Sequence, residues 1–220
     1  MRVLSVNIGR PQEREWKGLR VLTSIFKYPV EGEVRVGSLD LEGDEQADLS
    51  VHGGADKALY LYPSEHYAYW KEQLPEEVLT MGNFGENLTT EGVLESDVCV
   101  GDELKIGTAM VAITQPRLPC YKLQVRFNRE EMTKRFYESR RFGFYFRVLR
   151  EGTVAAGSAI RVVDRDPAQV TVSELIRLYT KDSRDPDLRR RAVRARYLPA
   201  GWRQELQGRA QAAASNPRRG

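Results

Sequence analysis

The chain has 220 residues and a formal net charge of +3, which suits one full-sized domain with a smaller appendage, or a single large β-rich domain. Its two cysteines, Cys99 and Cys120, are too few for a disulfide scaffold, so we expect a reducing compartment. Because no stretch has membrane-spanning length and residues 1–7 lack the pattern of a secretory signal, we expect a cytoplasmic protein without a membrane partner.

Residues 1–164 are predicted to form a domain of many short strands and few helices. Glycines at turn-like spacing separate the segments that favour strands, which are residues 3–8, 21–26, 33–36, 58–62, 98–100, 142–149 and 159–163. Residues 103–106 and 109–114 are expected to pair around Gly107-Thr108, a two-residue loop that suits a type II′ turn. This pattern favours a mainly β fold, either a barrel or a sandwich.

Two helices are expected within this domain. The first begins at Ser64, a suitable N-cap, and runs to about Leu74, with Tyr67 and Trp70 on its core-facing side. The second is predicted by the apolar periodicity of residues 129–140.

The pattern changes from strand to helix periodicity after residue 164. A capping box at residues 171–174, an Asp185-Pro186 start and an apolar pair at Trp202 and Leu206 indicate three short helices. We therefore expect a domain at residues 1–164, a three-helix subdomain at residues 165–207 and, from its composition, a disordered tail at residues 208–220.

The basic excess lies in this C-terminal part. Residues 165–220 contain thirteen Lys and Arg against six Asp and Glu. Such a segment suggests nucleic acid or an acidic partner surface, but a charge run is more often a solvated helix face, and no aromatic and basic RNA motif is present. The sequence therefore does not favour a nucleic-acid partner.

The most specialised stretch follows the apolar residues 111–114. A cysteine follows two prolines in the segment Gln115-Pro116-Arg117-Leu118-Pro119-Cys120-Tyr121-Lys122-Leu123. The prolines restrict the backbone, so the loop can aim the Cys120 sulfur in one direction. Arg117 and Lys122 are expected to lower the pKa of the thiol and favour the thiolate, which attacks electrophiles and binds soft metals. A lone cysteine is also commonly a small buried hydrophobe, and the residues alone leave both interpretations open.

Other chemical classes find little support. Two histidines and two cysteines without a recognised spacing do not favour a zinc site. A papain-like pairing of Cys120 with His52 or His66 lacks a flanking signature, and no glycine-rich nucleotide-binding motif is present. Cys99, which lies between two valines, is interpreted as a core residue.

Five segments together resemble the MOSC-domain family, in its YiiM-type bacterial branch. They are the cysteine motif at residues 115–123, residues 41–48, residues 51–58 (Val51-His52-Gly53-Gly54-Ala55-Asp56-Lys57-Ala58), residues 64–67 with Trp70, and Phe84-Gly85-Glu86-Asn87-Leu88-Thr89. Their order and spacing also match, and the resemblance extends over almost the whole chain. It implies a MOSC-type β-barrel with a few peripheral helices and a C-terminal three-helix subdomain.

The resemblance further implies a cleft that binds the molybdenum cofactor, with the Cys120 sulfur as a metal ligand beside the pterin dithiolene. Thiolate is a soft donor, which suits molybdenum. Arg117, Lys27 and Lys57 would receive the cofactor phosphate or the oxo groups, because a bound anion needs cationic or N–H partners. Lys27 also fits a solvated strand residue. In a sample without cofactor, an oxyanion such as phosphate or sulfate is expected in its place.

The remaining candidates each have two interpretations. His52 and Asp56 could supply the protons that an N–O reduction consumes, or they could simply fix their glycine-rich loop. Glu86 and Asn87 could hydrogen-bond the pterin, or they could form a buried pair that holds two loops together. His66 is interpreted as a structural imidazole.

As a function, the resemblance implies a molybdenum-dependent oxidoreductase that detoxifies N-hydroxylated bases and related compounds, such as 6-hydroxylaminopurine. Because the chain shows no flavin, haem or iron–sulfur ligand set, the electrons are expected from a separate flavoprotein reductase. The alternative is a carrier that holds the cofactor or a sulfur atom on Cys120 without turning over a substrate.

Overall fold

The structure is a computed structural model that describes residues 1–47, 53–180 and 185–214. The strands are β1 (Arg2–Ile8), β2 (Gln12–Trp16), β3 (Leu19–Thr23), β4 (Tyr28–Val30), β5 (Val34–Val36), β6 (Leu59–Pro63), β7 (Leu88–Glu91), β8 (Glu103–Ile106), β9 (Ala109–Pro116), β10 (Phe144–Arg150), β11 (Gly152–Val154) and β12 (Ile160–Asp164). The helices are the 3-10 turn η1 (Ala55–Lys57), α2 (Glu65–Gln73), α3 (Lys122–Phe127), α4 (Met132–Ser139), α5 (Val172–Thr180), α6 (Pro186–Ala192) and α7 (Ala200–Ala214).

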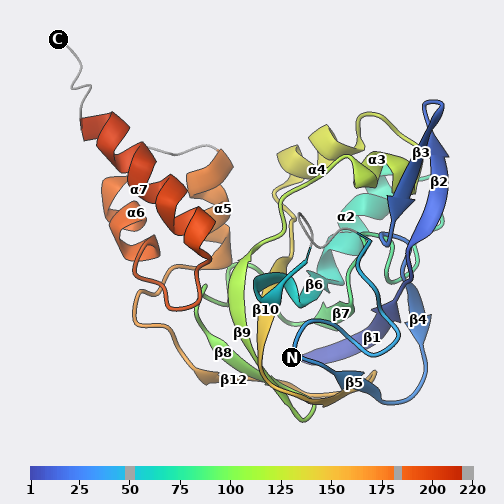
Figure 1. Ribbon diagram of the computed structural model, residues 1–220, viewed down its shortest axis with the longest axis horizontal. Coiled ribbons are helices and arrows are strands. Elements are labelled where there is room, and N and C mark those ends of the chain that lie inside the picture. Colours follow the sequence, from blue (N-terminus) through green and yellow to red (C-terminus); the bar gives the residue numbers. More distant parts are fainter. Residues whose placement is uncertain (48–52, 181–184, 215–220) are drawn as a thin grey trace.

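One large sheet organises the fold. Its eight strands follow the order β12-β8-β9-β10-β6-β7-β1-β4, and only the β6–β7 pair among them is parallel. Helices α2, α3 and α4 lie on one side of the molecule, and α5, α6 and α7 lie on the other (Figure 1). The mainly β prediction is therefore confirmed.

The predicted barrel is wrong, because the sheet is not closed. Strands β12 and β4 form the two ends of the strand order, and within the described residues no ladder joins them. Strand β1 meets residues next to β12 at an isolated bridge between Arg2 and Ala159 and through backbone hydrogen bonds of Val3 with Gly157 and Ser158. Strand β4 has only three residues and contains Pro29, whose nitrogen has no hydrogen to donate. Such a strand suits an edge and cannot continue a ladder of hydrogen bonds.

Most predicted elements form where the sequence places them. The β8–β9 hairpin pairs Ile106 with Ala109 around a two-residue loop, and Gly107 has the positive φ, 58°, that its turn needs. The prediction missed β2, whose sequence QEREW is mostly exposed. This strand is held by its pairing with β3 and not by an apolar face, so it carries little of the alternation from which strands are recognised.

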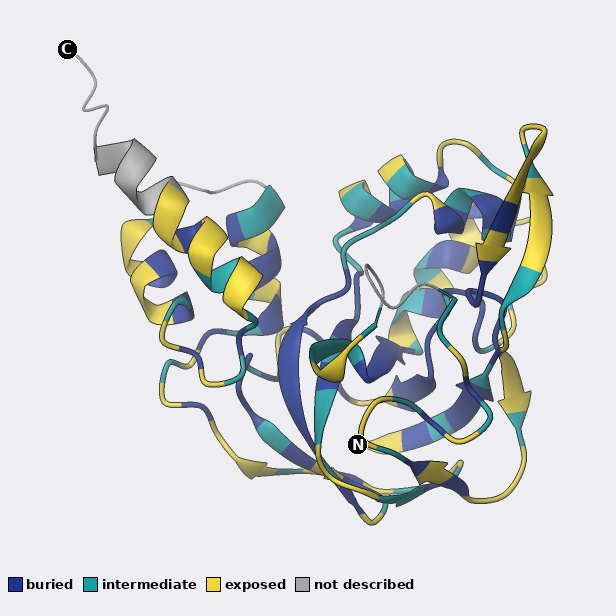
Figure 2. Cartoon of the chain, viewed as in Figure 1, coloured by how far each residue is buried: buried dark blue, intermediate teal, exposed yellow. Residues whose placement is uncertain are grey.

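An aromatic cluster fixes α2 and α4 against the sheet. The ring of Phe136 stacks on Trp70 at 5.8 Å and on Phe142 at 5.7 Å between ring centroids. The indole N–H of Trp70 donates a 2.7 Å hydrogen bond to the hydroxyl of Tyr62 on β6. Figure 2 draws parts of the central strands in dark blue, whereas α2 and α4 also carry teal and yellow on their outer faces. The rings of the cluster, Trp70, Phe136 and Phe142, are fully buried.

The C-terminal helices dock on the sheet through a buried carboxylate. The side chain of Asp166 is fully buried and accepts hydrogen bonds from the backbone N–H of Arg196 at 3.0 Å and from its Nε at 3.1 Å. Arg196 also pairs with Asp164 at 2.6 Å. Helix α7 continues to Ala214, although the composition predicted disorder from residue 208. Its continuation is explained by the high helix propensity of alanine, which is frequent in this segment. The division into domains stays a prediction.

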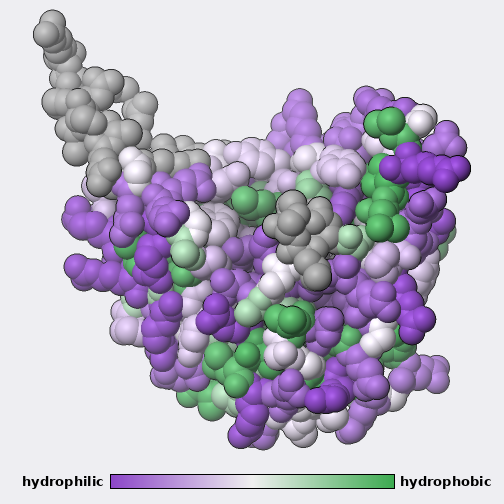
Figure 3. All heavy atoms as spheres, viewed as in Figure 1, coloured by the Kyte–Doolittle hydropathy of each residue, from purple (hydrophilic) through white to green (hydrophobic). Residues whose placement is uncertain are grey.

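The outer surface is consistent with the composition. The face drawn in Figure 3 is mainly hydrophilic, with separate hydrophobic patches, in a chain of which 30% of residues are charged. Among the described residues, no helix combines the length and the apolar character needed to cross a membrane.

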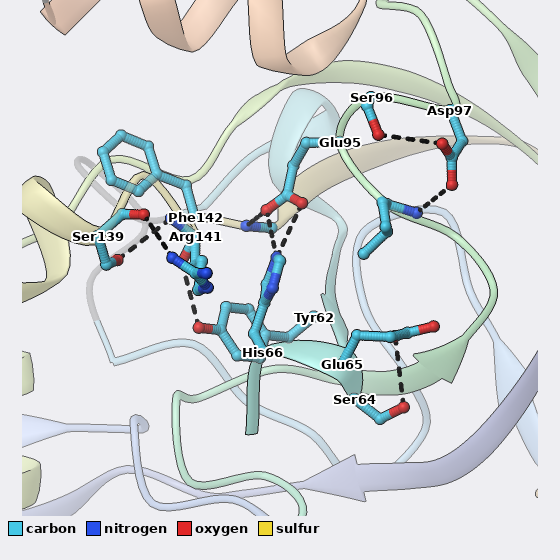
Figure 4. Close-up of polar contacts among 12 residues, drawn as sticks. Tyr62, Ser64, Glu65, His66, Glu95, Ser96, Asp97, Ser139, Arg141 and Phe142 are labelled. Carbon is cyan, nitrogen blue, oxygen red and sulfur yellow. Dashed lines mark hydrogen bonds and ion pairs between the residues drawn. The ribbon is translucent and has the colours of Figure 1, made fainter. Parts of the chain in front are cut away.

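His66 occupies a structural position at the start of α2 (Figure 4). Its Nε2 lies 2.8 Å from one carboxylate oxygen of the buried Glu95, whose other oxygen accepts a 2.7 Å hydrogen bond from the N–H of Gly143. Burial tends to raise the pKa of Glu95, but His66 and the N–H donors outweigh that effect and lower the pKa. This contact joins α2 to the start of β10.

We expect His66→Ala to lower the free energy of unfolding by about 2 kcal/mol at neutral pH, because it leaves the buried Glu95 carboxylate short of a partner. The lowered pKa of Glu95 stabilises the fold above the ordinary glutamate pKa of about 4.3, and this contribution is lost as the pH falls through the folded value. Urea unfolding from pH 7 to pH 3 should therefore show a weaker acid dependence in the variant. The exposed Lys71→Ala on the same helix should match wild type, and an equal loss in both variants would contradict the assignment.

Candidate functional site

An open cleft is lined by several loops together with Lys57 of η1, Tyr60 of β6 and Tyr145 of β10. It encloses about 580 Å³ of space, including its solvent-facing part. Five predicted site residues line it: Lys27, Lys57, Asn87, Arg117 and Cys120. These residues come from four separate parts of the chain, and the structure brings them together.

Cys120 lies in the short connection between β9 and α3. Its carbonyl oxygen accepts hydrogen bonds from the N–H of Leu123 at 3.1 Å and from the hydroxyl of Thr133 at 3.2 Å, which fix the loop to the first turn of α3 and to α4. The side chain is half-buried and lines the cleft. The loop thus holds the sulfur in place while leaving it accessible from the cleft.

Arg117 provides the main positive charge beside this sulfur. Its Nη2 lies 4.0 Å from the Cys120 Sγ, and its guanidinium carbon lies 5.5 Å from the ring centroid of Tyr60 and 5.3 Å from that of Phe136. Burial opposes the charged form, but the Cys120 sulfur and the Tyr60 hydroxyl more than offset it and raise the pKa of Arg117. Guanidinium over aromatic faces is a favourable arrangement for a desolvated cation.

One nitrogen of this guanidinium has no hydrogen bond in the part of the chain that the structure describes. The Nη1 of Arg117 is buried, and it finds no partner within the described ranges. The same holds for the buried hydroxyl of Ser24, another residue of the cleft wall. A buried donor without a partner is costly, and it marks a position where a bound group can complete the hydrogen bonding.

Lys27, by contrast, is already neutralised by a partner. Its ammonium group forms a buried ion pair with Asp44, and the other oxygen of Asp44 accepts a 2.8 Å hydrogen bond from the amide of Asn87. Burial lowers the pKa of Lys27, and Asp44 partly opposes this shift. The three side chains form a connected polar chain at the cleft wall, so Lys27 is not the solvated residue of the alternative interpretation.

Lys57 and Asp56 both belong to η1, but their side chains have different surroundings. Lys57 lines the cleft, and its partial burial lowers its pKa. The carboxylate of Asp56 is outside the cleft lining and receives two hydrogen bonds from the guanidinium of Arg147, at 2.9 and 2.5 Å. His52, the other predicted proton donor, lies outside the described residues.

Glu86 is not among the residues that line the cleft, and its assignment as a cofactor-binding residue stays a prediction. It is fully buried, and its carboxylate accepts hydrogen bonds from the hydroxyls of Tyr67 and Thr89 and from the N–H of Gly82 and Phe84. The carboxylate therefore ties a loop to α2 and β7. This is the structural role that the alternative interpretation gave to it, although the partners are not Asn87.

Sequence reasoning missed several residues of the cleft as binding candidates. They are Ser24, Tyr60, Lys122 and Tyr145. Lys122 was recognised only as a neighbour of the cysteine. Tyr60 and Tyr145 lie on β6 and β10, where aromatic residues are ordinary strand formers, so no sequence signal distinguished them from core residues.

The donor set of the cleft suits an anionic group that carries a soft metal. Arg117, Lys57 and Lys122 supply positive charge, and Cys120 supplies a soft sulfur donor. No group of three or more His, Cys, Asp or Glu able to hold a metal occurs in the described part of the chain.

The fold and this cleft correspond to a known class of protein. A family model for the MOSC domain matches residues 48–161, and the chain belongs to the MOSC-domain family. Protein YiiM of Escherichia coli (strain K12) is 38% identical over 189 residues, which cover 85% of this chain and 84% of that protein. A crystal structure of YiiM from Geobacillus stearothermophilus matches with a TM-score of 0.79 at 33% identity, covering 95% of this chain and 98% of that chain.

A further relative has a name that refers to an activity. A protein of Gibberella moniliformis (strain M3125 / FGSC 7600) named "Reductase" is 33% identical over 166 residues, which are 74% of this chain but only 29% of that protein. The match to YiiM proteins confirms the resemblance that the five sequence segments indicated.

We expect Asp44→Asn to lower the free energy of unfolding by about 3 kcal/mol at pH 7, because it leaves the Lys27 ammonium buried without a counter-charge. The pKa of Lys27, already lowered by burial, should fall further. Between the lowered pKa of Lys27 in the folded chain and its ordinary value of about 10.4, the unfolded chain binds a proton that the folded chain does not. The free energy of unfolding should therefore rise as the pH increases toward about 10.4.

Urea unfolding between pH 7 and pH 9.5 measures this dependence. Adding Lys27→Met to Asp44→Asn is the control, because it removes the titrating group. If the double variant shows the same rise with pH, the rise does not come from Lys27.

Proposed function

We propose that the chain is a molybdenum-cofactor-dependent oxidoreductase that reduces N-hydroxylated compounds. The observation that carries this proposal is the Cys120 sulfur 4.0 Å from a buried guanidinium whose Nη1 has no partner among the described residues, inside a cationic cleft. Membership of the MOSC-domain family and the relative named "Reductase" support it.

The residues of the cleft fit this cofactor by their chemistry. Cys120 would hold the molybdenum through its sulfur, a soft donor for a soft metal. Arg117 would donate hydrogen bonds to an oxo or phosphate oxygen from its Nη1, which has no partner among the described residues. Lys57 and Lys122 would balance the remaining negative charge. The Ser24 hydroxyl would donate a hydrogen bond to a further oxygen of the cofactor. Asn87, whose amide donates to Asp44, would help to fix the position of the cleft wall.

The reaction consumes two electrons and two protons. An N–O bond breaks, the hydroxylamine R–NHOH becomes the amine R–NH₂, and the oxygen leaves as water. The bound cofactor supplies the two-electron exchange, and a separate flavoprotein reductase supplies the electrons. Asp56 and His52 remain the proposed proton donors, with Arg147 holding the Asp56 carboxylate in place.

We expect Cys120→Ser to lose most of its molybdenum when the protein is produced in a host that makes the cofactor. Oxygen is a harder donor than sulfur, so serine binds the metal less well. The measurement is the molar ratio of metal to purified protein. Cys99→Ser is the matched control, because burial raises the pKa of Cys99 to about 11 and this residue does not line the cleft.

Equal molybdenum in wild type and in Cys120→Ser would refute the ligand assignment. Turnover separates an enzyme from a carrier. Wild-type protein with bound cofactor and an added flavoprotein reductase should convert 6-hydroxylaminopurine to adenine over many cycles. If molybdenum is bound but no turnover occurs, the protein is a carrier and not the reductase proposed here.

A further inference from the structure

The Cys120 sulfur can be reached from two sides. The residue is half-buried and lines both the cleft and a second cavity, which encloses about 1230 Å³ of space, including open solvent. The far wall of this second cavity comes from α5 and α7, through Tyr179 and Trp202. A small solute therefore has access to the sulfur through the cleft and also from the side of the C-terminal helices.

The side chain of Arg117 is placed to assist a reaction at this sulfur. It is 5% exposed, its Nη2 lies 4.0 Å from the Sγ of Cys120, and its Nη1 has no partner among the described residues. The hydroxyl of Ser24, which lines the same cleft, is also buried and finds no partner there. Buried donors of this kind can hydrogen-bond an oxygen that gains negative charge next to the sulfur. Electropositive, partly exposed surroundings are also those in which reactive cysteines occur.

The other cysteine of the chain has the opposite surroundings. The backbone N–H of Cys99 donates a 2.9 Å hydrogen bond to the carboxylate of Asp102, and the residue lines neither the cleft nor the second cavity. Burial and the charge of Asp102 raise the pKa of the Cys99 thiol to about 11. Because the chain has only these two cysteines, an oxidised Cys120 finds no second thiol in either cavity with which to form a disulfide.

We propose that Cys120 of the cofactor-free protein is a site of reversible oxidation, at which hydrogen peroxide converts the thiol to a sulfenic acid and Arg117 hydrogen-bonds the peroxide. The sulfur attacks one peroxide oxygen, and the S–O bond forms as the O–O bond breaks. The second oxygen leaves as water with the proton of the thiol. The sulfur is thereby oxidised by two electrons and the peroxide is reduced. A dithiol such as dithiothreitol reverses the step, because it becomes a disulfide while the sulfenic oxygen leaves as water.

This oxidation does not depend on the proposed reductase activity. A metal held by the sulfur would shield it, so the reaction belongs to protein that has not yet received a cofactor. A sulfenic acid no longer offers the thiolate that a soft metal prefers. Oxidation of Cys120 would therefore compete with loading of the cofactor.

The full-length protein, produced in a host that cannot make the cofactor, tests the site. It is treated with hydrogen peroxide and dimedone, which labels sulfenic acids, and mass spectrometry follows the label at Cys120 and at Cys99 of the same molecule. We expect Cys120 to be labelled about tenfold faster or more, because only its surroundings are electropositive. Dithiothreitol added before dimedone should remove the label. Equal labelling of the two cysteines, or none at Cys120, would overturn the proposal.

Variants of Arg117 separate assistance to the reaction from simple accessibility of the sulfur. Arg117→Gln should slow the peroxide reaction about tenfold or more, because the donor to the leaving oxygen is lost. Alkylation by iodoacetamide should slow much less, because its iodide leaving group depends less on a hydrogen-bond donor. Arg35→Gln, at an exposed arginine paired with Glu151, should match wild type in both reactions.

An equal slowing of peroxide oxidation and alkylation in Arg117→Gln would contradict the role given to Arg117, as would an unchanged peroxide rate. Circular dichroism checks that the variant is folded. The comparison of the two cysteines needs no variant, so it decides whether Cys120 is the oxidation site even if Arg117→Gln does not fold.

Discussion

The buried carboxylate of Asp44 is the constraint on which the cleft depends. It accepts a 2.8 Å hydrogen bond from the N–H of Gly9, pairs with the Lys27 ammonium and accepts a 2.8 Å hydrogen bond from the Asn87 amide. One side chain thus joins the end of β1 to the starts of β4 and β7. A charge buried this deeply is tolerated only when each of its oxygens has a partner, so the geometry of all three segments is restricted together.

The cleft contains two buried cations with different surroundings. Lys27 uses its charge within the protein, because Asp44 neutralises it. Arg117 lies over aromatic rings, and its Nη1 is left without a protein partner in the described structure. The proposed binding of an anion next to the Cys120 sulfur rests on this guanidinium nitrogen, which has no partner among the described residues, and on the cleft wall built around Asp44.

The two carboxylates predicted near the cleft show why residue type alone does not define a role. Glu86 lies in a segment that matches the family, yet its oxygens are occupied by Tyr67, Thr89 and two backbone N–H groups. Asp56 lies on η1 beside Lys57, yet its carboxylate faces Arg147. In both cases the deciding fact is which donors lie opposite the carboxylate. For Asp56 the donor, Arg147, is 91 residues away in the chain, whereas the donors to Glu86 are local except for Tyr67 of α2.

Local pattern determined much of this protein. Strand alternation, the Gly107 turn and the capping residues depend on neighbours along the chain, so the hairpin and most helices were readable from the sequence. The proline-rich loop also marked Cys120 as a candidate, and the structure places this residue at the cleft. The edges of the sheet, the Asp44 network and the meeting of Tyr60, Tyr145 and Lys122 around the cleft were decided by the tertiary structure. Those features depend on contacts between residues far apart in sequence, and burial, register and charge pairing of that kind leave no periodic signal in the chain.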